Sequence, residues 1–498
     1  MQTNKKIGFF LAVISFSLIV LFGNLDPTKP YINIMAAIAV LMAILWITEA
    51  IPLAATSLIP LIFFPITGIL STEEIASSYI NSIIFLFVGG FLIAIAMEDW
   101  SLHKRIALKI MTIFGGSPVS IILGFMLSGA LLSMWISNTA TALMLLPISL
   151  AVIQKLENQF GLEKTHNFTV ALLLSIAYSC TLGGIATLIG TPPNLVMVKM
   201  LSVLFPEAPE ISFGSWMIFA LPVSVLMLCA VAFLLTKVLF KVNKDIMLEK
   251  KFIRDEYESL GNVSFEEKAV SVVFLFTALL WIFRSDILLG STTIPGWSNL
   301  LPTADFINDG TVAITMAFIL FLIPSKSSKR ALLDHTSFSK IPWAIILLFG
   351  GGFALAKGFS STGLSNYIGE QLTGLHSVSP LLIIVVAAFL VSFLTELTSN
   401  TAVTQMLLPI VASVSVAVGM NPLILMITIT ISASMAFMLP VATPPNTIIF
   451  AGGRIRIIEM AKTGLALNIT GVIIVIMLVY FFGDLIFGLG SFPAWANP

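Results

Sequence analysis

The chain has 498 residues, of which 58% are hydrophobic and 10% are charged, and its 25 basic and 25 acidic residues cancel to zero net charge. A soluble domain carries about 25% charged residues, so this composition excludes a soluble globular protein. No basic stripe indicates a nucleic-acid partner. The lipid bilayer must therefore solvate much of the chain.

Long apolar runs recur along the sequence. They lie near residues 7–23, 31–48, 80–97, 119–136, 166–186, 212–236, 268–283, 312–323, 343–356, 380–394, 421–440 and 464–488. The longer runs reach the roughly 20 residues that a helix needs to cross the hydrocarbon core. Backbone groups in lipid must be satisfied within the segment, which favours helices over strands. The runs predict an all-α polytopic membrane protein whose first run is an uncleaved span.

Charges gather in a few connecting segments. Four basic residues crowd the loop 326–340, whereas the loop 286–309 has no lysine or arginine. By the positive-inside tendency, the first loop faces the cytoplasm and the second faces outside. The long charged stretch 237–268 is then a cytoplasmic linker between two halves of a multi-pass protein of the cell membrane.

Four short blocks occur twice in the same order, 262 residues apart for the first three and 252 for the last. The pairs are 89–91 with 351–353, 137–140 with 399–402, 144–148 with 406–410, and 191–194 with 443–446. Duplicated halves with interrupted apolar segments in matching places point to the binding site of a transporter.

The tripeptide Ser137-Asn138-Thr139 interrupts the run 119–150, which is longer than one span needs. This pattern predicts a re-entrant hairpin that turns at the tripeptide, because Ser, Asn and Thr are natural helix caps. The positive end of the returning helix would then face an anion. The second half repeats the design in 380–410, at Ser399, Asn400 and Thr401.

The repeated Thr-Pro-Pro-Asn blocks complement these tips. Because proline lacks an N–H, the prolines at 192–193 are expected to free the carbonyls of Leu188 and Ile189, and those at 444–445 the carbonyls at 440–441. Oxygen ligands of this kind suit a hard cation such as Na⁺. No lysine, arginine or histidine lies inside the blocks. A bound anion would rest on hydroxyls, amides, helix dipoles and a co-bound cation, and two equivalent tips suit a dicarboxylate.

Two carboxylates lie beside motifs. Glu396 precedes Ser399 by three residues, and an intramembrane carboxylate is a functional candidate by default. It could carry a proton or tune a cation site, or it could be a structural carboxylate hydrogen-bonded inside the protein. Glu49 is expected at a helix end, with a structural role.

Four segments resemble the signatures of the divalent anion/sodium symporter family, the INDY-type dicarboxylate transporters. They are Ser-Met-Trp-Ile-Ser-Asn-Thr-Ala-Thr-Ala (133–142), Thr-Glu-Leu-Thr-Ser-Asn-Thr-Ala (395–402), Val-Ala-Thr-Pro-Pro-Asn (441–446) and Trp-Ile-Thr-Glu-Ala-Ile-Pro (46–52). The resemblance implies about eleven transmembrane helices plus two re-entrant hairpins in an inverted repeat. It also implies a homodimeric scaffold, 1–115 and 242–377, and an elevator-type transport domain, 116–241 and 378–498.

The resemblance also implies the ligands. The first sodium site would comprise Ser133, Ser137, Asn138 and the carbonyl of Gly190, and the second Thr395, the backbone of Thr398, Asn400 and the carbonyl of Ala442. Substrate would contact Ser137, Asn138, Thr139, Ser399, Asn400, Thr401, Thr443 and Pro444. The prolines at 192–193 point to the carbonyls of Leu188 and Ile189 instead of that of Gly190, within the same segment.

The implied function is sodium-coupled import of C4-dicarboxylates such as succinate, fumarate and malate, with Na⁺ as the coupling ion. A sodium-independent exchanger, a proton-coupled carrier and a citrate- or sulfate-preferring member remain alternatives on the same fold. An enzyme is disfavoured because the four histidines, at 103, 166, 335 and 376, are isolated and form no metal or nucleophile motif.

Overall fold

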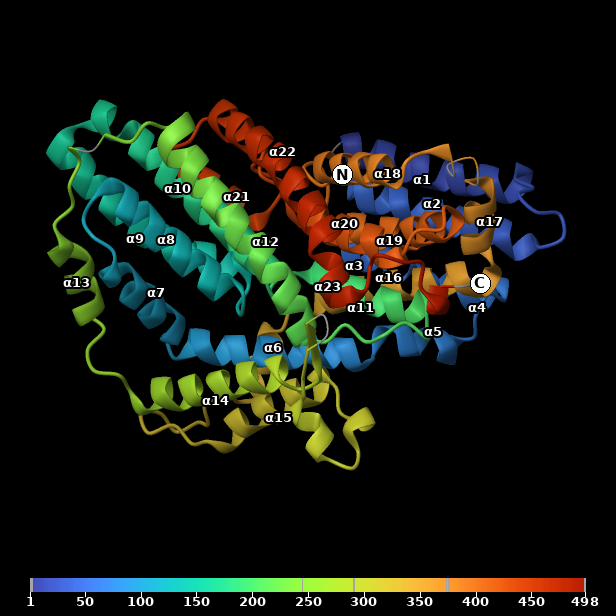
Figure 1. Ribbon diagram of the computed structural model, residues 1–498, viewed down its shortest axis with the longest axis horizontal. Helices are drawn as coiled ribbons and strands as arrows, with labels where there is room; N and C mark the ends of the chain where they lie inside the picture. Colours follow the sequence, from blue (N-terminus) through green and yellow to red (C-terminus); the bar gives the residue numbers. More distant parts are fainter. Residues whose placement is uncertain (1–2, 244, 290–291, 373, 375–376, 497–498) are drawn as a thin grey trace.

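The computed structural model describes residues 3–243, 245–289, 292–372, 374 and 377–496. Among these residues, nine helical segments are long and apolar enough to cross a membrane, and six shorter apolar helices accompany them. Regular structure is almost entirely helical (Figure 1). The predicted all-α polytopic class is confirmed.

The helices of the first half are bounded as follows. They are α1 (Thr3–Phe22), α2 (Pro30–Thr48), α3 (Leu53–Thr56), α4 (Ile59–Thr67), α5 (Thr72–Tyr79), α6 (Ser82–Asp99), α7 (Leu102–Ile113), α8 (Pro118–Ser133), α9 (Asn138–Phe160), α10 (Leu162–Ile185), α11 (Pro192–Leu204) and α12 (Phe213–Phe233). A π-helical turn, Leu234–Leu239, continues α12.

The second half begins after the charged linker. Its helices are α13 (Lys250–Glu258), α14 (Phe265–Ile282), α15 (Asp309–Leu322), α16 (Trp343–Thr362), α17 (Leu364–Gln371), α18 (Pro380–Leu394), α19 (Asn400–Ala417), α20 (Pro422–Ser434), α21 (Pro444–Ala451), α22 (Ile457–Phe481) and α23 (Gly483–Phe487). Short 3₁₀ turns lie at Trp297–Leu300, Ala304–Phe306, His335–Lys340 and Ala494–Ala496. An antiparallel ribbon of β1 (Ile287–Leu289) and β2 (Thr292–Ile294) occupies the loop after α14, where the sequence predicted no strand.

Both halves contain a hairpin followed by a broken helix. The pair α8–α9 forms the first hairpin, and the pair α18–α19 forms the second. The returning arm α9 continues to Phe160, beyond the predicted end of the hairpin at 150. The helices α10 and α20 each stop before a stretch of irregular backbone, after which α11 and α21 start.

The prolines begin helices instead of interrupting them. Pro192 and Pro444 are the first residues of α11 and α21. At this position the missing N–H has no partner to lose, and the fixed φ of proline suits the helix. The expectation that these prolines free the carbonyls of Leu188 and Ile189 is therefore wrong, because those two residues lie in the irregular segment and not in a helix that the prolines break.

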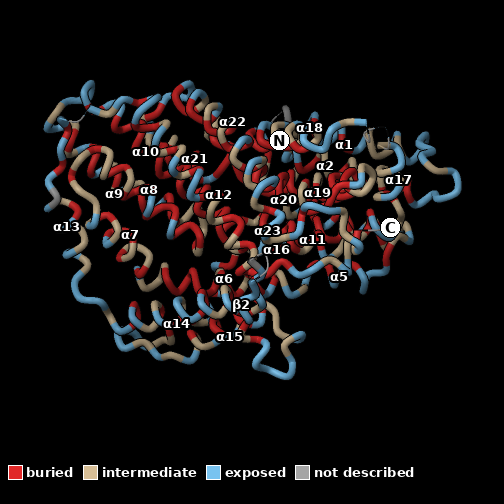
Figure 2. Tube along the Cα trace, in the orientation of Figure 1, coloured by how far each residue is buried: buried red, intermediate tan, exposed pale blue. Residues whose placement is uncertain are grey.

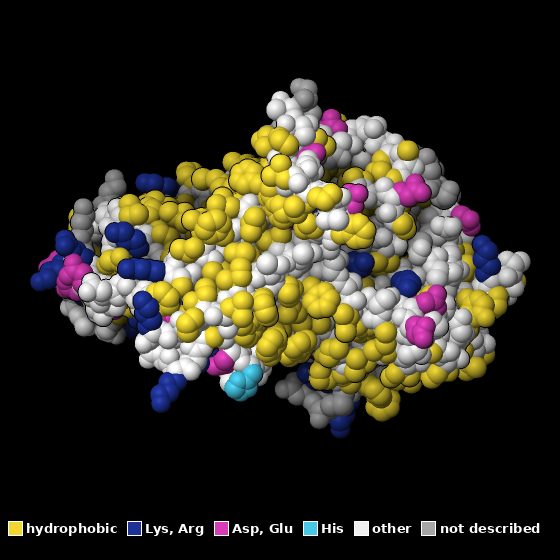
Figure 3. Space-filling model, turned by 90° about the horizontal axis from the view of Figure 1, so that it is seen from below, with side chains coloured by type: hydrophobic (Ala, Val, Ile, Leu, Met, Phe, Trp, Pro, Cys, Tyr) yellow, Lys and Arg dark blue, Asp and Glu magenta, His cyan; other side chains and the backbone are white. Residues whose placement is uncertain are grey.

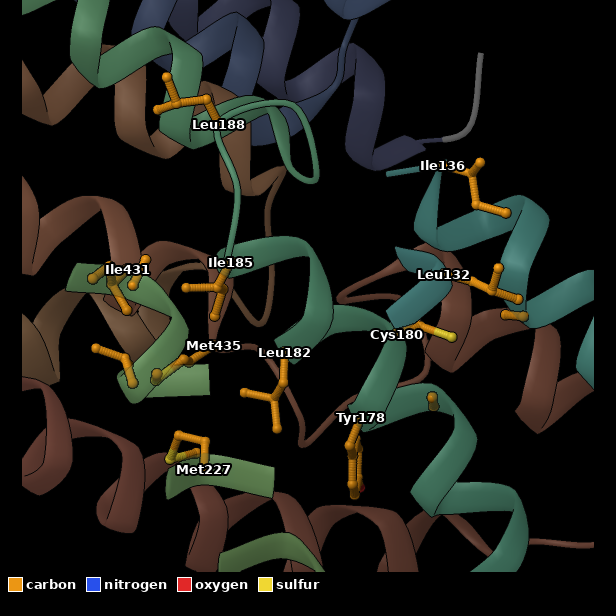
Figure 4. Close-up of a cluster of buried hydrophobic side chains, with 14 of the residues drawn as sticks. Leu132, Ile136, Tyr178, Cys180, Leu182, Ile185, Leu188, Met227, Ile431 and Met435 are labelled. Carbon is orange, nitrogen blue, oxygen red and sulfur yellow. The ribbon is translucent and has the colours of Figure 1, made fainter. Parts of the chain in front are cut away.

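The broken helices form the centre of the molecule. The membrane-spanning window of α10 is 100% buried. Leu182 and Ile185 of α10 lie beside Ile431 and Met435 at the end of α20, with Met227 of α12 nearby (Figure 4). Figure 2 shows the same pattern along the whole chain, with buried segments in the middle and exposed segments in the outer loops and around α13.

The outer surface is suited to lipid. The window of α1 is only 11% buried, and large apolar side chains such as Phe22 and Ile66 are exposed. Hydrophobic side chains cover much of the face in Figure 3, and charged side chains gather toward the two ends. This distribution is typical of a protein whose middle is solvated by hydrocarbon.

Buried ion pairs fasten the connecting segments. Arg105 of α7 lies 2.6 Å from Glu267, at the end of the charged linker. In a second network, the buried Arg284 lies 2.5 Å from the buried Asp309 and 2.6 Å from the exposed Glu210. This second network joins α14 and α15 to the segment that precedes α12.

Candidate functional site

The two hairpin tips are helix N-termini capped by serine. Ser137 precedes α9, and its hydroxyl accepts a hydrogen bond from the N–H of Ala140 at 3.1 Å. Ser399 precedes α19 in the same way and accepts from the N–H of Ala402 at 3.5 Å. The predicted caps therefore form, and each tip presents free N–H groups and a positive dipole end.

Both tips and both broken helices open into one cavity of about 750 Å³. Its polar wall contains Ser137, Asn138, Thr139, Gly190, Thr191, Pro192, Thr398, Ser399, Asn400, Thr401, Ala442, Thr443 and Pro444. All residues that the sequence predicted for the substrate thus meet at one place. Of the predicted sodium ligands, Ser133 and Thr395 lie beneath this wall and are fully buried.

In the first repeat, polar atoms converge behind the tip. The hydroxyl of Ser133 is hydrogen-bonded to the amide of Asn138. The same amide faces the carbonyl oxygens of Gly190 and Cys180, and with its nitrogen toward them it donates to both at 3.2 Å. In the opposite orientation four oxygens would face one another, an arrangement that a cation among them would stabilise.

The second repeat places a hydroxyl and an amide in the matching positions, together with the backbone carbonyl of Ala433. The hydroxyl of Thr395 lies 2.6 Å from Oδ1 of Asn400 and 2.8 Å from the carbonyl oxygen of Ala433. Thr398 turns its hydroxyl to the carbonyl of Leu394 at 3.0 Å, which leaves its backbone for any ligand. In both repeats a hydroxyl thus contacts the tip asparagine five residues later.

The backbone carbonyl of Gly190 lies close to the first tip. It lies beside Asn138 and Gly184, whereas Ile189 lies with its side chain against Gly90 of α6. A Cβ on Gly184 would come within 2.8 Å of the Gly190 oxygen, so this close approach requires glycine. Gly190 is also the residue whose carbonyl the family resemblance implies as a sodium ligand.

Glu396 is a hydrogen-bonded structural carboxylate. It is 3% exposed and accepts from the N–H groups of Phe437, Met438 and Leu439 at 2.7, 2.9 and 3.1 Å, and from Nδ2 of Asn468 at 2.7 Å. It does not line the cavity. Of the two interpretations from sequence, these contacts support the structural one, since the carboxylate holds the irregular segment between α20 and α21.

The sequence did not predict the residues of the opposite wall of the cavity. This wall includes Phe87 and Phe91 of α6, Leu348 of α16, and, toward one side, Lys5 and Glu49. Glu49 lies at the end of α2, as predicted, with a left-handed backbone (φ 45°). The motif 46–52 was a signal for Glu49, but no sequence pattern distinguished Lys5.

Helices that turn back at polar tips, duplicated around one cavity within an apolar exterior, define a polytopic membrane transporter. The chain belongs to the family whose model is described as the sodium:sulfate symporter transmembrane region, which it matches over residues 3–489.

Curated relatives and solved structures resemble the chain over most of its length. It is 42% identical over 495 residues to the sodium-dependent dicarboxylate transporter SdcS of Staphylococcus saprophyticus and 41% identical over 499 residues to SdcS of Staphylococcus aureus (strain MRSA252). Both alignments cover 98% of this chain and 93% of the relative.

Among solved structures, MtrF of Neisseria gonorrhoeae has a TM-score of 0.57 at 13% identity, over 92% of this chain and 96% of its own. YdaH of Alcanivorax borkumensis has a TM-score of 0.54 at 11% identity, over 84% and 88%. At these identities the likeness concerns the fold.

Proposed function

We propose that this protein imports C4-dicarboxylates such as succinate, fumarate and malate together with Na⁺. The observation that carries the proposal is the pair of Ser-Asn-Thr tips facing one cavity, each with a hydroxyl, an amide and a backbone carbonyl behind it. The name and near-complete coverage of the SdcS relatives support the same substrate class and ion.

The two ends of the substrate would bind at the two tips. Each carboxylate would accept hydrogen bonds from the serine and threonine hydroxyls and from the N–H groups of one tip, at Ser137 to Thr139 or at Ser399 to Thr401. Thr443 and Pro444 would complete the wall. Among the described residues that line the cavity, Lys5 is the only lysine or arginine, so the positive charge beside the substrate would come mainly from the coupled ions.

Sodium would bind behind each tip. The first ion would use Ser133, Ser137, Asn138 and the Gly190 carbonyl. The second would use Thr395, the backbone of Thr398, Asn400 and the Ala442 carbonyl. Because each tip asparagine belongs to an ion site and to the cavity wall, an ion would fix the tip geometry that the anion needs, which couples the two binding events.

Transport would follow an elevator mechanism. The hairpins and broken helices, within 116–241 and 378–498, would move as one body against a homodimeric scaffold made by 1–115 and 242–377. The packing of α10 on α8, α9 and α21, and of α19 on α11 and α20, supports a single moving body.

The test is uptake of radiolabelled succinate into proteoliposomes under an inward Na⁺, K⁺ or H⁺ gradient, without internal dicarboxylate. Net uptake with Na⁺ alone is expected, and unlabelled fumarate and malate should compete better than citrate or sulfate. Uptake that requires internal dicarboxylate and ignores Na⁺ would establish an exchanger and refute the proposed coupling. Stronger competition by sulfate would refute the substrate class.

A further inference from the structure

The irregular segments of the two broken helices carry many backbone carbonyls, but each proposed sodium site uses only one of them. The segments are 186–191, before α11, and 435–443, before α21. Carbonyls at the end of a helix and in irregular backbone have no helical N–H partners. Some feature of the sequence must therefore decide which oxygens are occupied and which one stays available to an ion.

A buried asparagine binds carbonyls at the end of α10 and in the irregular segment of the first repeat. Asn194, in the first turn of α11, is fully buried. Its Nδ2 lies 2.7 Å from the carbonyl oxygen of Thr187, 3.2 Å from that of Ile185 and 3.4 Å from that of Gly184. The donors of one side chain thus tie the end of α10 and the irregular segment to the start of α11.

The second repeat builds the same contact. Asn446, in the first turn of α21, is fully buried, and its Nδ2 lies 3.1 Å from the carbonyl oxygen of Leu439 and 3.2 Å from that of Ala436. Leu439 and Ala436 follow Thr187 and Gly184 by 252 residues, the spacing of the Thr-Pro-Pro-Asn blocks themselves. The two repeats therefore form the same asparagine contact at equivalent positions, each next to a proposed sodium site.

In both asparagines, the amide N–H groups form all the side-chain hydrogen bonds to described residues. Oδ1 of Asn194 and Oδ1 of Asn446 are buried and form no hydrogen bond to any described residue. Neither asparagine lines the cavity. In the first repeat Thr187 adds a second restraint, because its hydroxyl donates to the carbonyl of Met134 at 2.5 Å and accepts from the N–H of Gly190 at 3.1 Å.

We infer that Asn194 and Asn446 are positioning residues for the coupling ions. By tying the end of one helix and the irregular segment to the start of the next helix, they would fix the turns that carry the carbonyls of Gly190 and Ala442. The inference rests on the proposed sodium sites and adds to them the residues that set their geometry. Groups that orient the ligands of a metal typically change its affinity about 10–100-fold when they are removed.

The test uses Asn194→Asp and Asn446→Asp, which keep the side-chain volume and lose the N–H donors. Two quantities are measured: the Na⁺ concentration for half-maximal succinate uptake, and the Na⁺-dependent rise in melting temperature of the purified protein without substrate. Both variants should need at least about tenfold more Na⁺. At saturating Na⁺, the half-saturating succinate concentration should stay within about twofold of the native value.

Ser415→Ala is the matched control, because Ser415 is a fully buried hydroxyl of α19 bonded to the carbonyl of Val411 within its own helix. It should leave the Na⁺ requirement unchanged. If the aspartate variants do not purify as folded protein, Asn194→Ser and Asn446→Ser retain a shorter donor and should show a smaller shift in the same direction.

An unchanged Na⁺ requirement in the asparagine variants, with native protein that responds to Na⁺, would overturn the inference and leave the proposed function intact. Equal weakening of Na⁺ and succinate would also overturn it, since that result indicates a general structural role. Native protein whose uptake and melting temperature ignore Na⁺ would instead refute the proposed coupling, and the inference with it.

Discussion

At the scale of single residues, Asn138 and Asn400 occupy equivalent places in the two hairpins. Each is the second residue of its tip and the first residue of a helix, and each contacts a hydroxyl five residues earlier. Each also lines the cavity. One side chain can therefore link an ion behind the tip to an anion in front of it.

Replacing either asparagine should reduce transport without unfolding the protein. Asn138→Ala and Asn400→Ala each remove an amide from the cavity wall without disturbing the serine caps, so the protein should keep its fold while uptake falls below about a tenth of the native rate. Proteoliposome uptake and size-exclusion chromatography measure the two properties. Near-native uptake by either variant would contradict the site assignment.

Glu396 and Lys5 show where residue-level reasoning from sequence reached its limit. Glu396 was recognisable as unusual, but its partners at 437–439 and at Asn468 come from segments that only tertiary packing brings to it. Lys5 reaches the cavity because Gly8, three residues later, packs directly on Thr48 at the end of α2. Neither relationship follows a local pattern, so neither could be predicted.

At the scale of elements, the helix caps at the hairpin tips could be predicted from the sequence. The irregular segments before α11 and α21 could be predicted only in part. The caps at Ser137 and Ser399 follow from the preference of serine for helix N-termini, a local property. The positions of the Pro-Pro pairs were informative as well. The effect of these prolines on the helices could not be predicted. A proline that breaks a helix and a proline that begins one look alike in sequence until the structure of the preceding segment is known.

The repeated Gly-Gly-Phe element places α6 and α16 against the hairpin and broken-helix body. Gly90 of α6 faces the side chain of Ile189, and Gly352 of α16 faces the side chain of Gln405, whose Nε2 donates to the carbonyl of Leu348 at 2.9 Å. A Cβ on Gly90 would lie 3.4 Å from Ile189, an ordinary contact. A Cβ on Gly352 would overlap the buried amide of Gln405.

Alanine at these two glycines should therefore have unequal effects. Gly352→Ala should lower stability by about 1–3 kcal/mol, the usual result of overpacking, and should slow uptake because it displaces Gln405. Gly90→Ala, the repeat-related control, should change both only slightly. The measurements are the melting temperature and the initial uptake rate. If both variants had the same melting temperature and uptake rate, the close contact between Gly352 and Gln405 would not limit the side chain at position 352.

At the scale of the whole molecule, the two halves interlock. The helix α11 packs on α19 and α20 of the second half, and α21 packs on α9 and α10 of the first. Neither half therefore completes the cavity alone, and the two Ser-Asn-Thr tips and the two Thr-Pro-Pro-Asn blocks meet only in the assembled fold. The repeated blocks predicted the duplication, and the composition and the long apolar runs predicted the all-α class. The contacts between helices of opposite halves could not be predicted, because they depend on packing between segments far apart in the sequence.

The central claim is that the assembled site binds a dicarboxylate only together with Na⁺. The most direct test is equilibrium binding of radiolabelled succinate to the purified protein across a range of Na⁺ concentrations, with K⁺ keeping the ionic strength constant. The expected result is succinate binding that rises with Na⁺ and weakens by at least about tenfold when K⁺ replaces it. Succinate binding of equal affinity in K⁺ and in Na⁺ would contradict it.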